Sequence, residues 1–220
     1  MDAVKDRLPC TCADFFSIDR AVDLNDGRRG VMFAAVEAPL VEFGKITTDA
    51  WSENLAVETG NLYSYVMNNY WFTNYQFSQG GPHTFRYAIK RYEGPFDPVA
   101  ASQFGEEAVR PLEARVVWQG NAGRWAKASS WSAMQIQPDN VIVACVKPAE
   151  EGRGIILRLA ESAGRDAEVR LSAKGLSPGT LWRCTLLEDD IERIGPSDGS
   201  AKFRLGPWQI ATMRLIPEGT

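Results

Sequence analysis

Histidine and cysteine are scarce in this chain. Its 220 residues include one histidine, His83, and four cysteines. A zinc site needs several such ligands at short, defined spacings, and the sequence contains no HxxxH, HxE or CxxC pattern. Any serine-based triad would have to rely on His83 alone, because no other histidine exists to act as its base. We therefore assign no catalytic residue and no metal ligand to this chain.

An excess of basic residues and long apolar runs are also lacking. The net charge is −4 and the isoelectric point is about 5.2, which argues against a nucleic-acid partner. No apolar segment approaches the length that spans a membrane, and residues 1–16 lack the apolar stretch of a signal peptide. We expect Cys145 and Cys184 to be small core residues. Together these features favour a cytoplasmic protein without membrane contacts.

The sequence is rich in patterns that are typical of β-strands and hairpin turns. Asn25-Asp26-Gly27 is a hairpin turn of a common type. The segment 31–43 is rich in valine, phenylalanine and leucine, and Pro39 breaks it. Further apolar–polar alternation, with a period of two residues, predicts strands at 62–72, 83–92 and 114–120.

One helix interrupts the strands. Asp97 followed by Pro98 is the preferred start of a helix, which we expect near 98–110, although Gly105 is unfavourable inside it. Residues 121–132 are small and polar apart from their tryptophans, so they predict a boundary. Five short strands are then expected at 140–150, 154–162, 167–175, 181–189 and 201–217.

The predicted fold is therefore all-β. We expect a flexible segment at 1–12 and part of a large antiparallel β-sandwich, with one inserted helix, at 13–130. A smaller antiparallel β-sandwich is expected at 134–220.

Carboxylate pairs are the remaining enzymatic option. Glu106-Glu107 lie on the predicted helix, and Glu188-Asp189-Asp190 follow a predicted strand. A glycosidase needs two carboxyl groups that face each other across a sugar in different electrostatic environments. Neighbouring residues on one surface do not meet that requirement. We expect both clusters to form a solvated face or a turn.

The most unusual segment is VMNNYWFTNYQFSQGG, at 66–81. It combines amides, which donate and accept hydrogen bonds, with aromatic rings that can cover the C–H face of a sugar. The alternative is structural, with the amides bonding an irregular backbone while the rings pack. The candidate substrate-binding residues in this run are Asn68, Asn69, Trp71, Thr73 and Asn74. Arg86, on the next predicted strand, and Arg20 are weaker candidates, and the alternative for each is a surface or strand-pairing charge.

Several segments, in the same order, resemble the C-terminal β region of glycoside hydrolase family 38 α-mannosidases. The first pair is NNYWFTN (68–74) followed by GGPHTFRY (80–87). The others are the turn and strand with APLVEFG (15–44), the KPAEEGRG hairpin (138–159), LLEDD (186–190) and FRLGPWQIATMRL (203–215). One departure is Ala21, where the family leads us to expect an aromatic residue.

The resemblance implies that this chain is part of a retaining exo-glycosidase. The family's aspartate nucleophile and its zinc ligands lie in an N-terminal α/β domain and a helical bundle, neither of which is present here. The implied role is to pack against that catalytic domain and to complete its mannoside pocket. The isolated chain would then be inactive, and the expected zinc would belong to the missing domain.

Two alternatives remain open. The chain could be an independent carbohydrate-binding module that recognises mannosides by itself. It could also be a structural or interaction domain whose exposed apolar face, normally covered by the missing domain, favours dimerisation or binding to a partner.

Overall fold

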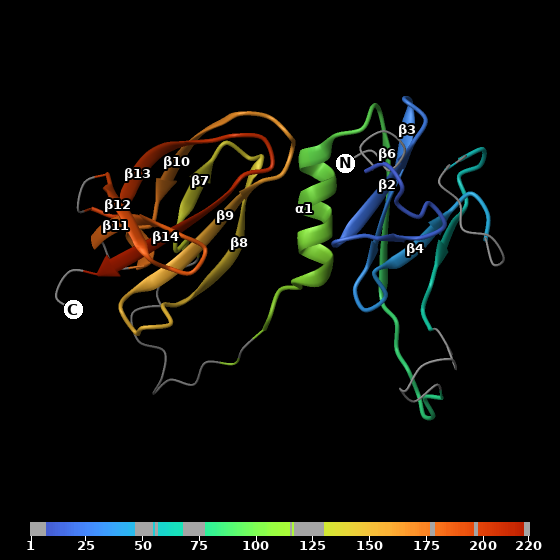
Figure 1. Cartoon of the computed structure of the whole chain (residues 1–220), viewed down its shortest axis with the longest axis horizontal. Coiled ribbons are helices and arrows are strands. Elements are labelled where there is room, and N and C mark those ends of the chain that lie inside the picture. Colours follow the sequence, from blue (N-terminus) through green and yellow to red (C-terminus); the bar gives the residue numbers. More distant parts are fainter. Residues whose placement is uncertain are drawn as a thin grey trace. The chain divides into compact units, whose positions relative to one another are not determined.

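The chain folds into antiparallel β-sheets with one α-helix, which confirms the predicted all-β class (Figure 1). The structure is a computed structural model, and it describes residues 8–46, 55, 57–67, 78–114, 116, 130–176, 179–195 and 198–217. The chain divides into two compact units, Met1–Leu112 and Glu113–Thr220, each described separately below. The boundaries at 1–12, 13–130 and 134–220 remain predictions. No helix within the described ranges is long and apolar enough to cross a membrane.

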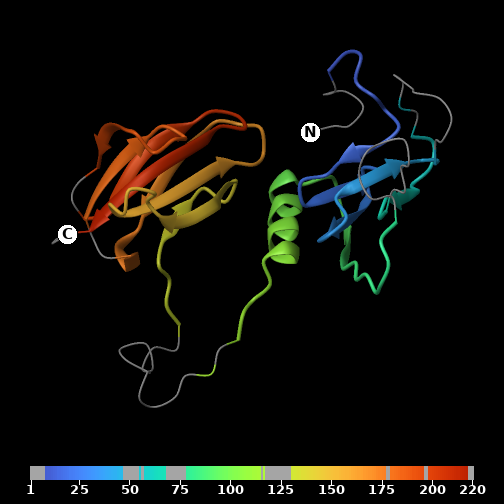
Figure 2. The same ribbon diagram turned by 60° about the horizontal axis from the view of Figure 1, so that its bottom comes forward.

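Within the described residues, the N-terminal unit contains two three-stranded sheets, ordered β1-β4-β5 and β2-β3-β6, and one helix. The helix lies beside the β2-β3-β6 sheet (Figure 2). A small apolar core joins Val22 and Phe33 of the second sheet to Val41 and Phe43 of the first. The elements are β1 (Phe16–Ser17), β2 (Ala21–Asn25), β3 (Arg29–Ala35), β4 (Leu40–Phe43), β5 (Leu62–Ser64), β6 (Tyr87–Glu93) and α1 (Pro98–Val109).

The hairpin between β2 and β3 forms where the sequence predicts it. Gly27 adopts a φ of 87°, which glycine tolerates without steric cost. The Asp26 carboxylate accepts hydrogen bonds from the backbone N–H groups of Arg28 and Arg29, both at 2.9 Å. The break at Pro39 is also confirmed, since β3 ends at Ala35 and β4 begins at Leu40.

Two predicted strands are shorter than the alternation suggests. β6 begins at Tyr87, because residues 83–86 form no ladder, and β5 ends at Ser64. In β6 the alternating apolar residues Tyr87 and Ile89 are exposed, whereas Ala88 and Tyr92 on the other face are partly buried, so period-two alternation identified the strand but not its buried face. The strand predicted at 114–120 lies largely outside the described residues.

Helix α1 starts as predicted, and its glycine has a packing role. The Asp97 carboxylate accepts hydrogen bonds from the Val99 and Ala100 N–H groups, at 2.9 and 3.3 Å. A Cβ atom added at Gly105 would lie 3.0 Å from Cβ of Arg20 and 3.1 Å from Cβ of Ala21. The missing side chain therefore allows α1 to approach the start of β2 closely.

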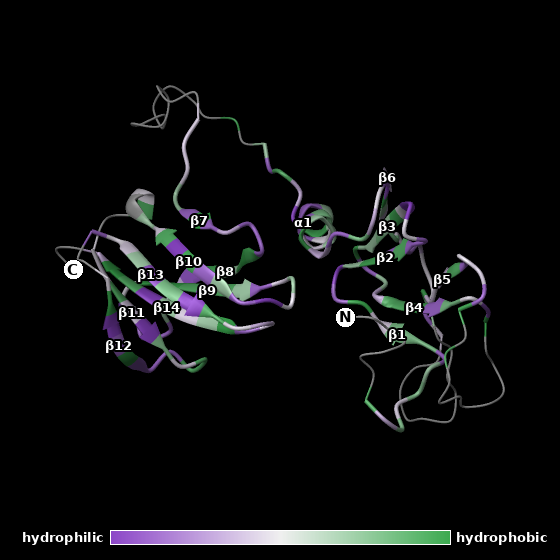
Figure 3. Cartoon of the chain, turned by 90° about the horizontal axis from the view of Figure 1, so that it is seen from above, coloured by the Kyte–Doolittle hydropathy of each residue, from purple (hydrophilic) through white to green (hydrophobic). Residues whose placement is uncertain are grey.

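The C-terminal unit packs a three-stranded sheet, β13-β10-β7, against a five-stranded sheet, β12-β11-β14-β9-β8. Alternate residues of β14, Ala211, Met213 and Leu215, belong to the core cluster, and the intervening Thr212 and Arg214 are buried on the other face. Hydrophobic and hydrophilic residues both occur along the strands of this unit (Figure 3). The elements are β7 (Gln135–Gln137), β8 (Val141–Pro148), β9 (Ile155–Glu161), β10 (Ala167–Ser172), η3 (Lys174–Leu176), β11 (Gly179–Cys184), β12 (Asp190–Ile194), β13 (Ser200–Leu205) and β14 (Ile210–Pro217).

Five predicted strands in this unit correspond to eight observed ones in the described ranges. Residues 201–217 form two strands, β13 and β14, separated by a turn in which the Gln209 N–H donates to the Gly206 carbonyl. Residues 185–189 leave the sheet after β11 and form a turn. β7 and β12 are additional short edge strands, which carry too little periodicity to be recognised.

The close approach at Gly105 gives a stability prediction. We expect Gly105→Leu to lower the free energy of unfolding of the N-terminal unit by about 1–3 kcal/mol, because the new side chain must displace Arg20 or Ala21. Gln103→Leu, on the exposed surface of the same helix, should change it by less than about 0.5 kcal/mol. Denaturant unfolding followed by circular dichroism tests this, and equal effects of the two substitutions would contradict it.

Candidate functional site

The predicted sugar-facing run connects the two sheets of the N-terminal unit. β5 ends at Ser64 in one sheet, and β6 begins at Tyr87 in the other. The Ser64 and Tyr87 hydroxyls lie 2.9 Å apart and hydrogen-bond each other. Of the candidate residues between them, Arg86 lies within the described residues, and the remainder lie outside them: Asn68, Asn69, Trp71, Thr73 and Asn74.

Arg86 is held in place by Glu37. Its Nε donates to Oε1 of Glu37 at 2.6 Å, and its backbone N–H donates to Oε2 at 2.7 Å. The Arg86 carbonyl in turn accepts the Val36 N–H at 3.0 Å. The hydrogen bond from the Arg86 backbone N–H lowers the pKa of Glu37 most, and the one from the guanidinium lowers it further. The guanidinium stays 63% exposed, so it can reach a neighbouring ligand.

One aromatic ring lies next to this pair, because Tyr87 follows Arg86 and stacks on Phe33 with ring centroids 5.3 Å apart. Tyr65 and Phe15, whose ring centroids are 6.4 Å apart, lie on the opposite face of the first sheet from Ser64. Tyr65, Phe15 and Tyr87 are all partly exposed. We name Glu37, Ser64, Arg86 and Tyr87 the β5–β6 edge. It combines a cation, two hydroxyls and an aromatic face, which are groups suited to contact a sugar.

Sequence reasoning found Arg86 but missed its three companions. Glu37 lies in the break between β3 and β4, and its role depends on a partner 49 residues away. Ser64 and Tyr87 become neighbours only because the two sheets meet. Only the aromatic–polar alternation of the segment at 83–92 pointed to Tyr87, and no local signal marked Glu37 or Ser64.

The other weaker candidate, Arg20, contacts the helix. Its Nη1 atom lies 2.8 Å from Asp19 and 2.8 Å from Oε1 of Glu106, which also pairs with Arg110 at 3.2 Å. The prediction that Glu106 lies on a solvated face is therefore wrong, because its side chain is largely buried in this ion-pair group. Glu107 is exposed, as predicted. This arrangement fixes α1 to the sheet.

A half-buried carboxyl, Asp23, lies on the face of the sheet that α1 covers. Burial raises its pKa, while a hydrogen bond from Tyr92, 2.9 Å from each carboxylate oxygen, acts in the opposite direction. Asn25 donates to the Tyr92 hydroxyl at 2.8 Å. The Tyr92 ring lies so close to Gly30 that a Cβ there would be 2.3 Å from it. These contacts are those of a packed polar group rather than of a glycosidase acid that faces a second carboxyl.

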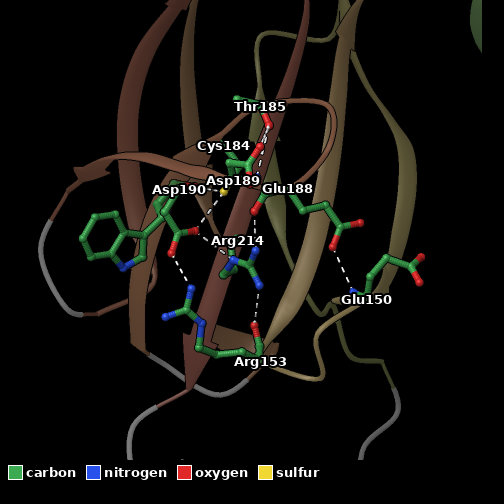
Figure 4. Close-up of polar contacts among 9 residues, drawn as sticks. Glu150, Arg153, Cys184, Thr185, Glu188, Asp189, Asp190 and Arg214 are labelled. Atoms are coloured by element: carbon green, nitrogen blue, oxygen red, sulfur yellow. Dashed lines mark hydrogen bonds and ion pairs between the residues drawn. The ribbon is translucent and has the colours of Figure 1, made fainter.

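The acidic cluster of the C-terminal unit surrounds a buried arginine (Figure 4). Arg214 Nε donates to Asp190 at 2.9 Å, Nη1 to the Arg153 carbonyl at 3.0 Å, and Nη2 to the Glu188 carbonyl. Arg153 also pairs with Asp190 at 2.7 Å. A buried guanidinium needs partners for its charge and its N–H groups. The Glu188 carbonyl and the Asp190 carboxylate supply them, and this holds the turn at 185–189 against the sheet.

Glu188 is the second centre of this cluster. Its side chain accepts the Glu150 backbone N–H at 2.9 Å and lies 2.6 Å from Lys147, which also pairs with Glu150. Glu188 has a φ of 74°, a left-handed conformation that is strained for a residue with a side chain. The cluster lies in a turn, as predicted, but Glu188 is not solvated, since only 6% of its side chain is exposed.

A further buried carboxylate, Glu161, closes the other end of β9. It accepts hydrogen bonds from Asn140 Nδ2 at 2.7 Å and from the backbone N–H groups of Ala163, Gly164 and Trp208 at 2.8, 2.8 and 3.0 Å. Burial alone would raise its pKa, but these donors bring the pKa below its usual value. An ionised carboxylate used in this way holds loops together and has no free oxygen for acid–base work.

His83 and the cysteines form no metal cluster. His83 is exposed, and in the described ranges no three His, Cys, Asp or Glu side chains lie together as ligands. Cys184 is buried, as predicted, and its thiol donates to Asp190 at 3.3 Å. Cys145 is only partly buried.

Comparison with known proteins follows the same division of the chain. Residues 140–213 match the model of the glycosyl hydrolases family 38 C-terminal beta sandwich domain. Alpha-mannosidase 2C1 of Homo sapiens is 29% identical over 141 residues, covering 62% of this chain and 13% of that protein.

Two solved structures from Enterococcus faecalis share the fold. One is a protein in glycosyl hydrolase family 38 and the other is an alpha-mannosidase of strain V583. Each is 15% identical with a TM-score of 0.58; both matches cover 92% of this chain but only 23% and 21% of the solved chains. The chain thus spans less than a quarter of the length of the relatives it matches.

The paired sheets and these matches define a β-sandwich chain that is similar to the C-terminal region of family 38 proteins. More narrowly, residues 140–213 match the C-terminal β-sandwich domain of that family, and the resemblance to the C-terminal region of its α-mannosidases is confirmed.

The buried thiol gives a reactivity prediction. Burial, followed by the hydrogen bond to Asp190, raises the pKa of Cys184 to about 11, so we expect little thiolate at pH 8. A thiol reagent should label exposed Cys10 in the native chain and reach Cys184 only after denaturation. Cys10→Ser should remove the fast phase, whereas Cys184→Ser should not change it. Rapid labelling of Cys184 in the native chain would show that the turn at 185–189 does not cover it.

The second prediction concerns pH. Hydrogen bonds from Lys147 and then Glu150 hold the folded pKa of Glu188 below its ordinary value of 4.5. The stabilisation is therefore present above about pH 4.5 and is lost as pH falls through the lower, folded pKa. Glu188→Gln should lower stability at pH 7 and flatten its decline in acid. Exposed Glu192→Gln serves as the control, with denaturant midpoints measured from pH 7 to 3; identical acid profiles for both variants would disprove the role of Glu188.

Proposed function

We propose that this chain is the C-terminal, non-catalytic β portion of an α-mannosidase-like retaining glycoside hydrolase. It would support the sugar pocket of a zinc-dependent catalytic α/β domain carried on other polypeptide, within mannose metabolism. The match of residues 140–213 to the family's C-terminal domain and the similarity to a human α-mannosidase support this function.

The observation that carries the proposal is the β5–β6 edge. Glu37 fixes the Arg86 backbone and orients its guanidinium, and Tyr87 is stacked and hydrogen-bonded beside it. These contacts position the groups without a ligand, so less ordering would be needed on binding. They flank both ends of the run that holds the proposed amide ligands.

This chain's role would be to bind and orient the mannoside. Arg86 and the Asn-rich run would hold sugar hydroxyls, and the aromatic groups would cover its C–H face. The donor set of the described residues does not fit a zinc ion, because no three candidate ligands converge. We therefore derive no step through the metal and place zinc in the separate domain. A cytoplasmic location agrees with the free cysteines.

A carbohydrate-binding module is the second candidate. The exposed rings of Phe15 and Tyr65, on the opposite face of the first sheet from Ser64, favour it because exposed aromatic faces are suited to sugars. Such a module would bind mannose without any other domain. A purely structural domain would bind no sugar under any condition.

The purified chain should not hydrolyse an aryl α-mannoside, with or without added zinc. Turnover that depends on the metal and survives rigorous purification would refute the proposal. Titration calorimetry with mannose and a mannose oligosaccharide separates the alternatives. Affinity in the isolated chain that is lost in Trp71→Ala and Asn69→Ala would favour the binding module.

A further inference from the structure

Trp208, in the turn between β13 and β14, is exposed and has a strained backbone. Its side chain is 55% exposed, whereas tryptophan is highly buried on average. Its φ is 59°, a left-handed conformation that is costly for a residue with a side chain. Such strain persists only where surrounding contacts impose it, and it is concentrated at ligand-binding sites. The position of Trp208 therefore calls for a functional explanation.

Two contacts hold the tryptophan in this position. Its backbone N–H donates to Oε2 of buried Glu161 at 3.0 Å, and the Gly164 N–H donates to the same oxygen at 2.8 Å. A Cβ atom added at Gly164 would lie 2.7 Å from Cζ2 and 3.0 Å from Nε1 of Trp208, so the indole lies directly against this glycine. The ring is thus positioned without a ligand, and more than half of it remains open to solvent.

An open groove of about 690 Å³ begins beside Gly164. Its walls come from residues 136–140, at the end of β7 and the loop that follows, and from residues 165–170, which include most of β10. We name it the β7–β10 groove. Arg165, the neighbour of Gly164 in the chain, lines it. Asn140 also lines it and donates to Oε1 of Glu161 at 2.7 Å. The carboxylate that holds Trp208 therefore also holds a wall of the groove.

The charged side chains of the groove favour a neutral ligand with many hydroxyl groups. Three carboxylates and two guanidiniums line it, and all five residues are exposed: Asp139, Arg165, Asp166, Glu168 and Arg170. These charges nearly cancel, so neither an anion nor a cation is strongly attracted. Guanidiniums donate and carboxylates accept hydrogen bonds in pairs, whereas each sugar hydroxyl can do both. An open indole can also cover the C–H face of a pyranose.

We propose that Trp208 and the β7–β10 groove form a carbohydrate site on the C-terminal unit, separate from the β5–β6 edge. Trp208 covers the C–H face of one sugar ring, and the charged side chains of the groove hold the hydroxyls of the next ring. The ligand class is a neutral oligosaccharide. The choice of mannose as its sugar rests on the proposed function, but the site and its residues do not. This chain then binds oligosaccharide through Trp208 without hydrolysing it.

Titration calorimetry of the full chain with an α-linked mannose trisaccharide tests the site. Trp208→Ala should raise the dissociation constant at least about tenfold, because the stacking surface is lost. Trp131→Ala is the matched control, since Trp131 is 53% exposed in the same unit and should leave the constant unchanged. Arg165→Ala should also weaken binding, whereas Arg86→Ala, which removes a guanidinium of the β5–β6 edge, should not.

Nuclear magnetic resonance tests the contact in the unaltered chain, even if Trp208→Ala fails to fold. The indole N–H resonance of Trp208, identified by its loss in Trp208→Phe, should shift when the trisaccharide is added, and that of Trp131 should not. A chain with no affinity for the trisaccharide would overturn this inference and leave the proposed function standing. Affinity that survives Trp208→Ala but is lost in Arg86→Ala would overturn it too, and would assign the sugar to the N-terminal unit. Hydrolysis by the isolated chain would instead refute the proposed function.

Discussion

The antiparallel ladder between β3 and β6 determines which backbone groups and side chains the N-terminal unit exposes along β6. Seven residue pairs fix which backbone groups of β6 face inward. The ladder also places Arg86 where Glu37 can hold both its backbone and its guanidinium. A shift of one residue would exchange the two faces of the strand. The proposed sugar-facing edge therefore depends on this register.

In the C-terminal unit, polar contacts hold a turn over the outer face of the five-stranded sheet. Its inner face is closed by aliphatic side chains from both sheets. On the outer face, buried Arg214 donates hydrogen bonds to Asp190 and to two backbone carbonyls. Glu188 binds the Lys147 ammonium and the Glu150 backbone N–H. Each charge is matched by a partner, as burial demands. Glu188 and Asp190, which the sequence offers as candidate catalytic carboxylates, thus hold the turn at 185–189 against the sheet.

Strand and helix types could be predicted because they depend on local signals. Asp97-Pro98 marks the start of α1, and Asn25-Asp26-Gly27 marks a hairpin. The buried face of β6 could not be predicted, because the cover over a sheet face depends on other elements. Glu106 was misjudged for the same reason, since Arg20 lies far from it in sequence. Gly105 looked unfavourable in a helix until its contact with β2 was known.

In the candidate site, too, some residues could be predicted from the sequence and others only from the structure. Composition pointed to the Asn-rich run, and Arg86 was a weaker candidate beside it, whereas Ser64 and Glu37 emerge only when two sheets bring them together. The family resemblance depended on several ordered segments, of which 138–159, 186–190 and 203–215 lie in or overlap the range of the family match. The proposed function rests on those segments rather than on any single motif.

The central claim is that this chain completes a sugar site whose reactive groups belong to other polypeptide. Its most direct test is to express the coding sequence immediately upstream and to measure α-mannoside turnover with and without this chain. We predict that a zinc-binding α/β domain is encoded there and that its turnover requires this chain and falls with Arg86→Ala. Full turnover by that domain alone would contradict the account.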